Sequence, residues 1–370
     1  INTGNTPSLT QVLEIVDTTD GIAQFEAVGG TVDVGLYAYE VMRGDELGLD
    51  PTNWYLGNTQ KPSEGARAIL NTAAGLTSMW FTQMDNLHRR MGQQRLVDPG
   101  GLANDVWLRG YSRKIEVDDS VSGRPFDEHI DGIDIGIDTV VSTDDVDTWI
   151  AGAFAGYGRA DRDFNDFGSY GESRTPYGGL YGTWFDRVGY YVDATFKVQY
   201  FDNEFEALDG SGNRHRGEYN RLGIGGGVEV GRRFYFDEGW SIQPQAQVHY
   251  VHLNSDEHTT DHNTHVKLES NSIWQARAGL EGGREMTDAG GGVWYPYLRV
   301  SIIEQFSEGN KLTAETLSFT PKLTGTSFEY GGGLIYQMDD HRQGYLALTT
   351  GTGDHYDTPW AINFGLRYEF

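Results

Sequence analysis

The 370-residue chain lacks cysteine, which excludes a disulfide framework, a zinc–thiolate site and a thiol nucleophile. It also lacks any run approaching the roughly 18 consecutive apolar residues that a membrane-spanning helix needs. Basic residues are scarce, with 28 lysines and arginines against 54 aspartates and glutamates, and the formal net charge is −26. Because nucleic-acid phosphates repel an acidic surface, this balance argues against a nucleic-acid partner.

Glycine and aromatic residues are abundant instead, with 50 Gly, 9 Trp, 21 Tyr and 17 Phe. The final segment, 360–370, alternates without a break between large apolar residues and small or polar ones. Its apolar positions are Trp360, Ile362, Phe364, Leu366, Tyr368 and Phe370. A strand with one apolar and one polar face suits the wall of a transmembrane β-barrel, which has lipid outside and water inside.

The same alternation recurs in segments back to residue 106, and we predict twelve strands, an even number as in bacterial single-chain barrels. The predicted strands are 106–117, 130–142, 147–162, 174–185, 189–204, 217–233, 240–253, 268–284, 293–307, 326–338, 342–352 and 358–370. Short turns alternate with mostly longer polar connections, as expected for periplasmic turns and extracellular loops. A soluble β-sandwich or propeller would seldom alternate its loops in this way.

The first hundred residues differ in kind. Residues 1–56 indicate short strands broken by glycine, and they are too few to bury a core alone, so we expect the end of a larger β structure. From about 62 to 94 the apolar period becomes helical. About thirty helical residues would span about 45 Å, more than the hydrocarbon layer of about 30 Å. The helix is either an ordinary surface or core helix or a plug threaded through the barrel.

Four motifs occur in an order that resembles monomeric (type Va) autotransporters of the pertactin and serine-protease-autotransporter type. They are Asn53-Trp54-Tyr55-Leu56, Asp85-Asn86-Leu87-His88-Arg89-Arg90-Met91-Gly92, Trp107-Leu108-Arg109-Gly110-Tyr111 and Gln243-Pro244-Gln245-Ala246-Gln247. The resemblance covers essentially the whole chain. It implies an all-β membrane protein: a 12-stranded antiparallel transmembrane β-barrel with an α-helix threaded through the pore, preceded by the end of a right-handed parallel β-helix.

The domains implied are a C-terminal passenger segment at 1–59, autochaperone-like, a linker and pore-spanning helix at 60–104, and the barrel at 105–370. The function implied is an outer-membrane translocator that delivers its own N-terminal passenger to the surface of a Gram-negative cell by type V secretion. Implied partners are outer-membrane lipid and lipopolysaccharide, periplasmic chaperones, and the barrel assembly machinery, for which Tyr368 and Phe370 would be the signal. The barrel would be monomeric and need no cofactor.

Two other functions stay open. A passive outer-membrane porin explains the barrel but leaves residues 1–95 without a role. A barrel enzyme, such as an outer-membrane protease or lipase, would need a nucleophile or an acid pair at the rim of the loops. A crowded loop holds His252, His258, His262 and His265, but its spacing matches no metal motif, and we predict no metal site.

In family members that release the passenger, a helix asparagine attacks its own carbonyl to give a succinimide, assisted by lumen acids and water. This chain has Asp85-Asn86 at the corresponding place. Aspartate lacks the amide nitrogen, so we expect cleavage between 85 and 86 to be slow or absent. Either the passenger is naturally retained or cleaved differently, or an asparagine was changed to aspartate. Asn86 could itself cyclise and cleave before Leu87.

Inward positions on the predicted strands supply four candidate acids for such a reaction: Asp134, Asp193, Glu229 and Glu281. Arg277 and Arg299 are candidates for contacts between the helix and the lumen, as are Arg89 and Arg90 from the helix side. The alternative for each acid is a solvated lumen residue that pairs with the helix arginines.

Overall fold

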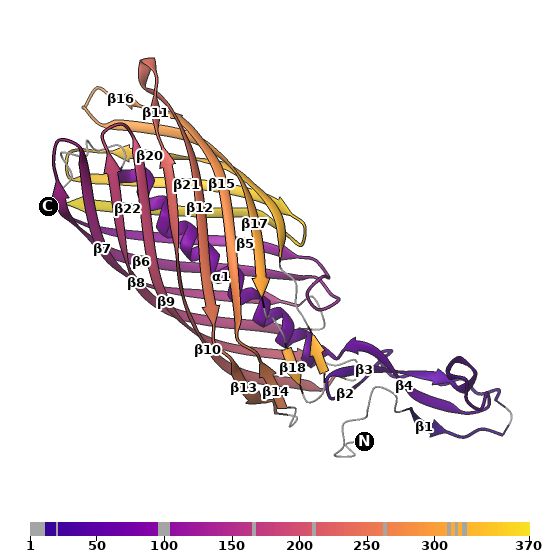
Figure 1. Ribbon diagram of the computed structural model, residues 1–370. Helices are drawn as coiled ribbons and strands as arrows, with labels where there is room; N and C mark the ends of the chain where they lie inside the picture. The colour runs from indigo at the N-terminus through magenta and orange to yellow at the C-terminus, as the bar shows by residue number, and fades with distance from the viewer. Residues whose placement is uncertain are drawn as a thin grey trace.

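The computed structural model describes residues 12–19, 21–94, 104–164, 168–208, 212–261, 265–308, 312–314, 317–319 and 324–370. A tilted β-barrel dominates the molecule, and a long helix, α1 (Glu64–Gln94), lies inside it (Figure 1). A small sheet lies beyond one end of the barrel, next to the start of α1 (Figure 1). No helix in the described part of the chain is both long and apolar enough to cross a lipid bilayer.

Twelve strands form a closed barrel, as the sequence predicted. They are β5 (Asp105–Val117), β6 (Phe126–Thr143), β7 (Asp147–Asp163), β8 (Tyr170–Asp186), β9 (Tyr190–Leu208), β10 (Arg214–Arg232), β12 (Trp240–Leu253), β15 (Asn271–Arg284), β17 (Val293–Glu308), β20 (Gly325–Gln337), β21 (Arg342–Gly353) and β22 (Tyr356–Glu369). Neighbours pair antiparallel, β22 pairs with β5, and β10 pairs with β12. The sheet therefore has no open edge in the barrel wall.

Side chains alternate strictly between the two faces of the wall. On β6, Ile133, Ile135 and Ile137 point outward and are 50 to 59% exposed, whereas Asp134 between them is fully buried in the lumen. The lumen side carries many buried polar residues, including Gln243, Gln245 and Gln247 of β12. The outward face is therefore apolar and the inward face polar, the reverse of a soluble β-sandwich.

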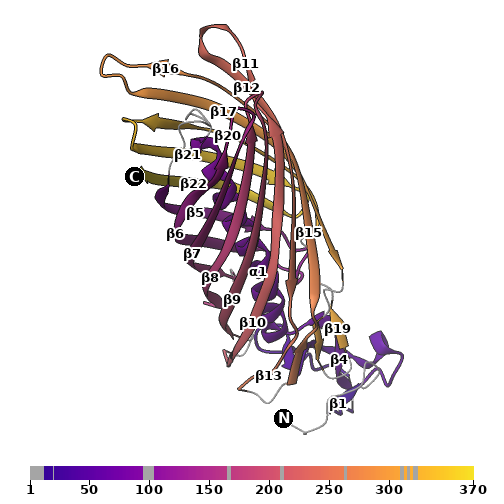
Figure 2. The ribbon, with the colours of Figure 1, turned by 60° about the vertical axis from the view of Figure 1, so that its left-hand side comes forward.

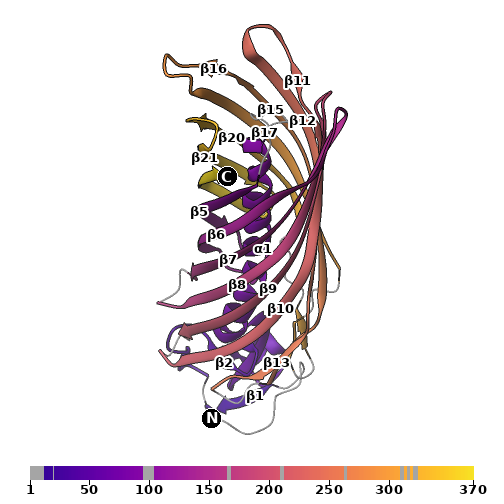
Figure 3. The ribbon, with the colours of Figure 1, turned by 90° about the vertical axis from the view of Figure 1, so that its left-hand side faces the viewer.

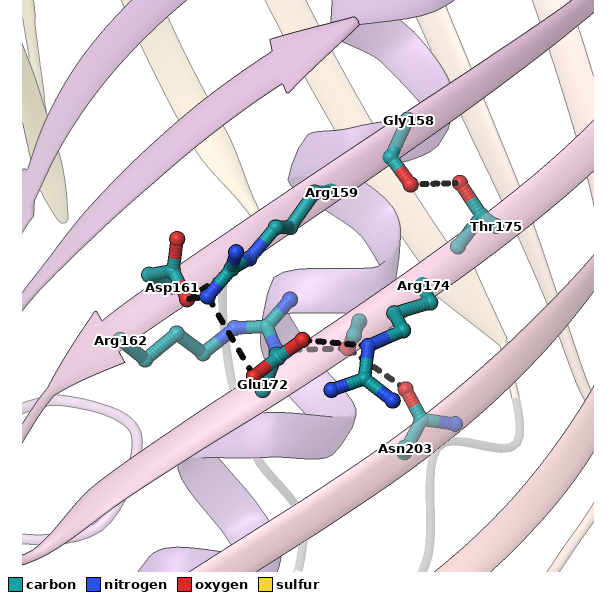
Figure 4. Close-up of polar contacts among 9 residues, drawn as sticks. Gly158, Arg159, Asp161, Arg162, Glu172, Arg174, Thr175 and Asn203 are labelled. Carbon is teal, nitrogen blue, oxygen red and sulfur yellow. Dashed lines mark hydrogen bonds and ion pairs between the residues drawn. The ribbon is translucent and has the colours of Figure 1, made fainter.

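Several strands run beyond the predicted limits at the end of the barrel that carries the long connections, which we call the loop end. β6 begins at Phe126 rather than 130, and β8 begins at Tyr170 rather than 174. The outward face there is charged. Arg159 contacts Asp161 at 2.8 Å and Glu172 at 3.4 Å, and Arg174 contacts Glu172 at 2.6 Å (Figure 4). The apolar alternation stops before the backbone pairing does, so the sequence pattern underestimated these strands.

Aspartates fix the short turns at the opposite end, which we call the turn end. Asp144 accepts hydrogen bonds from the backbone N–H groups of Val146 and Asp147, and Asp339 accepts them from His341 and Arg342. The N–H groups of Asp147 and Val146 hold the pKa of Asp144 below its ordinary value, and the Arg342 side chain acts similarly on the pKa of Asp339. Because the pKa of each aspartate is lower in the folded protein than in the unfolded chain, its contacts stabilise the fold at pH values above the unfolded-state pKa. This stabilisation is lost as the pH falls through the folded-state pKa.

Residues 13–62 form a separate four-stranded sheet in the order β1-β4-β3-β2. Its strands are β1 (Leu13–Val16), β2 (Val32–Val34), β3 (Tyr37–Arg43) and β4 (Trp54–Pro62), with the short 3-10 helix η1 (Gly44–Leu47) between the last two. Every pairing is antiparallel, so the parallel β-helix expected for this part is wrong for the described strands. Only two residues join β2 to β3, too few for the crossover that a parallel pair requires.

Short strands extend the barrel at both ends. At the turn end, β11 (Phe234–Tyr235), η3 (Asp237–Gly239) and β16 (Met286–Thr287) lengthen two hairpins (Figure 2). At the loop end, β13 (Asp256–Thr259), β14 (His265–Leu268), β18 (Leu312–Ala314) and β19 (Leu317–Phe319) form a small antiparallel sheet. This sheet lies at the same end of the barrel as the sheet of residues 13–62 (Figure 1).

The start of α1 is tied to the preceding sheet. The Ser63 hydroxyl donates to the Gly35 carbonyl at 3.0 Å and accepts from the Ala66 N–H at 3.3 Å, which makes Ser63 the N-cap. The Asp33 carboxylate accepts from the Glu64 N–H at 2.8 Å and satisfies another free N–H of the first turn. Glu64 also contacts Arg124, between β5 and β6, at 2.8 Å. Sheet, helix and barrel rim are thus joined at one point.

The helix then passes along the interior of the barrel (Figures 2 and 3). Its apolar residues, including Ile69, Leu70, Leu76, Met79 and Trp80, are almost fully buried. Towards the loop end the inward face of the wall is itself apolar, and these side chains join one cluster with the helix: Ile115, Phe126, Phe164, Phe201, Phe205 and Leu253 are among them. The predicted pore helix is therefore present, and apolar side chains of the wall pack against its first half.

A glycine in the middle of α1 lets a buried arginine approach the helix. A Cβ atom added at Gly75 would lie 2.1 Å from Nε of Arg162. Two hydrogen bonds fix the Arg162 side chain. Its Nε donates to Glu128 at 2.8 Å. Its Nη1 donates to Ser173 at 2.7 Å (Figure 4). Ser173 in turn donates to Asn203, so four neighbouring strands share the contact. The guanidinium cannot retreat without breaking buried hydrogen bonds.

We predict that Gly75→Ala destabilises the folded barrel by about 1–3 kcal/mol, the usual cost of overpacking, although alanine is about 1 kcal/mol better than glycine within a helix. The measurement is the temperature at which the folded form disappears on semi-native gels. The matched control is Gly65→Ala in the same helix, because a Cβ there meets its nearest atom at an ordinary 3.6 Å. Equal melting temperatures for the two variants would contradict the proposed clash.

Candidate functional site

Asp85, the residue at the expected cleavage position, lies buried in the lumen beside two wall arginines. Its Oδ1 is 3.4 Å from Nη1 of Arg277 on β15 and 3.6 Å from Nη2 of Arg299 on β17. Arg277 also contacts Glu329 on β20 at 2.8 Å. Three adjacent strands therefore contribute to one charged site around a single helix residue, and all four side chains are less than a tenth exposed.

The alternation of the strands explains why these side chains point inward. Leu298 and Val300 face outward on either side of Arg299, and Phe328 and Tyr330 do so around Glu329. The sequence analysis named Arg277 and Arg299 but missed Glu329. The run Phe328-Glu329-Tyr330 carries the same signal, since two large exposed aromatics flank one carboxylate.

A buried lysine clamps the helix one turn before Asp85. Lys197 of β9 is fully buried, and its Nζ donates to the Gln83 side chain at 2.9 Å and to the Trp80 carbonyl at 3.3 Å. The same ammonium lies 4.0 Å from the ring centre of Trp80 and 5.0 Å from that of Tyr177. Gln83 also donates to Thr175 at 3.3 Å. These contacts fix both the rotation and the axial position of this helical turn.

Arg109 of β5 adds a further cation to the same stretch of helix. Its Nη1 donates to the Leu87 carbonyl at 3.2 Å, and its guanidinium lies 4.6 Å from the ring centre of Trp107. Cations from four strands, Arg109, Lys197, Arg277 and Arg299, thus contact helix residues 80–87.

The four candidate acids make their described contacts with other wall residues. Tyr177 donates to Asp134, Thr183 donates to Asp193, and Glu281 lies 3.8 Å from Arg233. Glu229 accepts hydrogen bonds from Tyr191 and Gln247. These acids thus stiffen the lumen wall, and their assistance in peptide cleavage stays a prediction.

Other predicted site residues fall in two groups. The side chains of Asn86, Arg89 and Arg90 lie outside the described residues. Tyr368 and Phe370 lie exposed at the turn end, where the Phe370 N–H donates to the Asn104 carbonyl at 2.9 Å.

In the described part of the histidine-rich loop, His258 contacts Asp256 and His265 contacts Glu257. No group of three or more potential ligands for a metal ion occurs among the described residues.

Comparison with known proteins places these features in a family. Residues 106–349 match the autotransporter β-domain model, and residues 1–58 match the pertactin model. The chain is 30% identical over 311 residues to the pertactin autotransporter of Bordetella bronchiseptica, which covers 83% of this chain and 33% of the relative. It is 27% identical over 346 residues to the BrkA autotransporter of Bordetella pertussis, which covers 93% of this chain and 33% of the relative. The chain thus spans about a third of the length of these relatives.

Solved structures agree. The crystal structure of the β domain of the Bordetella autotransporter BrkA superposes with a TM-score of 0.64 at 25% identity, covering 72% of this chain and all of that one. The translocator domain of the autotransporter NalP from Neisseria meningitidis shares the fold, with a TM-score of 0.60 at 14% identity and coverage of 82% and 100%. The chain belongs to the autotransporter family, as an outer-membrane autotransporter β-domain with a pertactin-related segment before it.

Proposed function

We propose that this translocator keeps its passenger covalently joined to the pore helix after secretion. The observation that carries the proposal is Asp85, held between Arg277 and Arg299. The family resemblance implies an asparagine at this position in members that release the passenger. Self-cleavage by this route needs a side-chain amide nitrogen that is placed to attack the backbone carbonyl carbon of the same residue. Aspartate supplies no such nitrogen, and its carboxylate is directed towards the wall arginines.

The same ion pairs also hold the helix in its position in the lumen. Removing one partner from a buried ion pair leaves an uncompensated charge, which commonly costs about 3–5 kcal/mol. Arg277 contacts both Asp85 and Glu329, so Asp85 connects the helix to an ion pair of the wall. An uncut helix therefore stays seated, and the passenger stays anchored through it.

A small cavity beside the helix agrees with this proposal. The cavity, lined by residues that include Phe81, Arg113, Gln305 and Tyr356, has a volume of about 30 Å³. Such a space admits single water molecules but no larger solute. The match to the autotransporter β-domain model does not favour a diffusion porin.

The remaining assignments belong to the same proposal. Residues 1–59 would be the membrane-proximal end of the passenger, residues 60–104 the linker and helix, and residues 105–370 the barrel. The strand β4 runs to Pro62, so the sheet continues three residues past the first of these boundaries and meets the helix at Ser63. The exposed aromatic end at Tyr368 and Phe370 would be recognised by the barrel assembly machinery after delivery by periplasmic chaperones. Lipopolysaccharide would surround the outer half of the wall.

We predict that full-length protein purified from outer membranes gives one species that contains both passenger and barrel. Asp85→Asn should convert it into two pieces, with the barrel piece starting at residue 86, because the substitution supplies the missing amide nitrogen. Intact-mass spectrometry separates these results.

Asp85→Ala is the matched control for this prediction, since it removes the carboxylate without adding a nucleophile and should leave the chain uncut. A wild-type barrel piece starting at residue 86 or 87 would contradict the proposal. A start at Leu87 would identify Asn86 as the reactive residue, which Asn86→Ala would then abolish.

We also predict that Lys197→Met raises the open fraction of single barrels in planar bilayers. The loss of charged hydrogen bonds worth about 1.5–3 kcal/mol corresponds to about a 10- to 100-fold change. A variant without residues 1–104 supplies the conductance of the open barrel. Lys114→Met is the matched control, because Lys114 contacts Glu116 and Asp127 on the outer face. Equal open fractions for both lysine variants would show that Lys197 does not hold the helix.

A further inference from the structure

A groove of about 870 Å³ is cut into the outward face of the wall across β8, β9, β10, β12 and β15. Its rims are large outward side chains, among them Leu180, Phe196, Ile224 and Trp274. Its floor is made of the small residues Gly182, Ala194 and Gly226. The volume lies within the range of about 300–1,000 Å³ that is usual for small-molecule sites.

Backbone geometry fixes this hollow. A Cβ atom at Gly226, which faces outward, would lie 2.1 Å from the Thr195 carbonyl oxygen. The neighbouring strand β9 approaches β10 so closely that no side chain fits at this position. The wall is therefore indented by its own backbone, and rotamer changes alone cannot fill the floor.

The groove is polar at one end only. Near the loop end of β12 and β15, Tyr250 Oη and His252 Nδ1 each lie 3.1 Å from Ser272 Oγ, in a hydrogen-bonded cluster. The rest of the lining is largely apolar or glycine. The loop end faces the cell exterior, because the passenger-related residues lie there (Figure 1). An amphipathic ligand would therefore lie with its polar group outward and its chain towards the membrane centre.

We propose that this groove binds an acyl chain of one lipopolysaccharide molecule of the outer leaflet, with the headgroup at the cluster of Tyr250, His252 and Ser272. The groove is continuous with the lipid-facing wall, so a membrane lipid is the partner to which it is open. The polar cluster at the exterior end selects a lipid of the outer leaflet over one of the inner leaflet. This site does not depend on whether the passenger is retained.

Native mass spectrometry of the full-length protein, extracted from outer membranes in mild detergent, tests the proposal. Wild-type protein should carry one adduct with the mass of lipopolysaccharide. Gly182→Leu should reduce this adduct about tenfold, because the side chain points into the groove and the nearest atom to a Cβ there is 3.9 Å away. The matched control is Ala155→Leu, which also faces outward but lies outside the groove lining, and it should keep the adduct.

Semi-native gels establish that both variants are folded before the adducts are compared. Absence of the adduct from the wild type, equal loss in both leucine variants, or an adduct with the mass of a phospholipid would each overturn the proposal. The ratio of intact to cleaved chain in the same spectra reports passenger retention separately, so the failure of one proposal is distinguishable from the failure of the other.

Discussion

The requirement that every backbone polar group in lipid finds a partner underlies the rest of this structure. Strands can meet it only if the sheet closes on itself, and pairing of β5 with β22 and of β10 with β12 achieves that closure. Closure divides each strand into an outward and an inward set of residues. The apolar exterior, the polar lumen and the site around the helix all follow from this division.

The helix meets two different environments as it crosses the lumen. Towards the loop end, apolar wall side chains such as Phe201 and Phe205 belong to one buried cluster with helix residues, and Gly75 lies against Arg162. Further along, cations add to the apolar packing, and Lys197 and Arg109 donate hydrogen bonds to helix carbonyl groups. Asp85 lies within this second zone. The carboxylate of Asp85, at the predicted cleavage position, is therefore paired with two wall arginines.

Glycine acts on both faces of the wall. On the inward face, Gly158 and Gly223 leave room for Gln83 and Trp80 of the helix. On the outward face, Gly226 brings strands together closely enough to indent the surface. The abundance of glycine thus reflects close approach of backbones more than flexibility, and it connects the seating of the helix with the groove on the outside.

The sequence alone determined the strands, the pore helix and the family, because period-two alternation, helical spacing and motif order are local properties of the chain. It also identified Arg277 and Arg299 as inward residues. It underestimated β6 and β8, where charged outward residues ended the apolar pattern before the pairing ended. Only the tertiary structure decided that the sheet of residues 13–62 is antiparallel, that Arg162 meets Gly75, and that Asp85 lies between Arg277 and Arg299. These contacts join residues far apart in sequence, and barrel closure and helix depth set their distances, which no local pattern encodes.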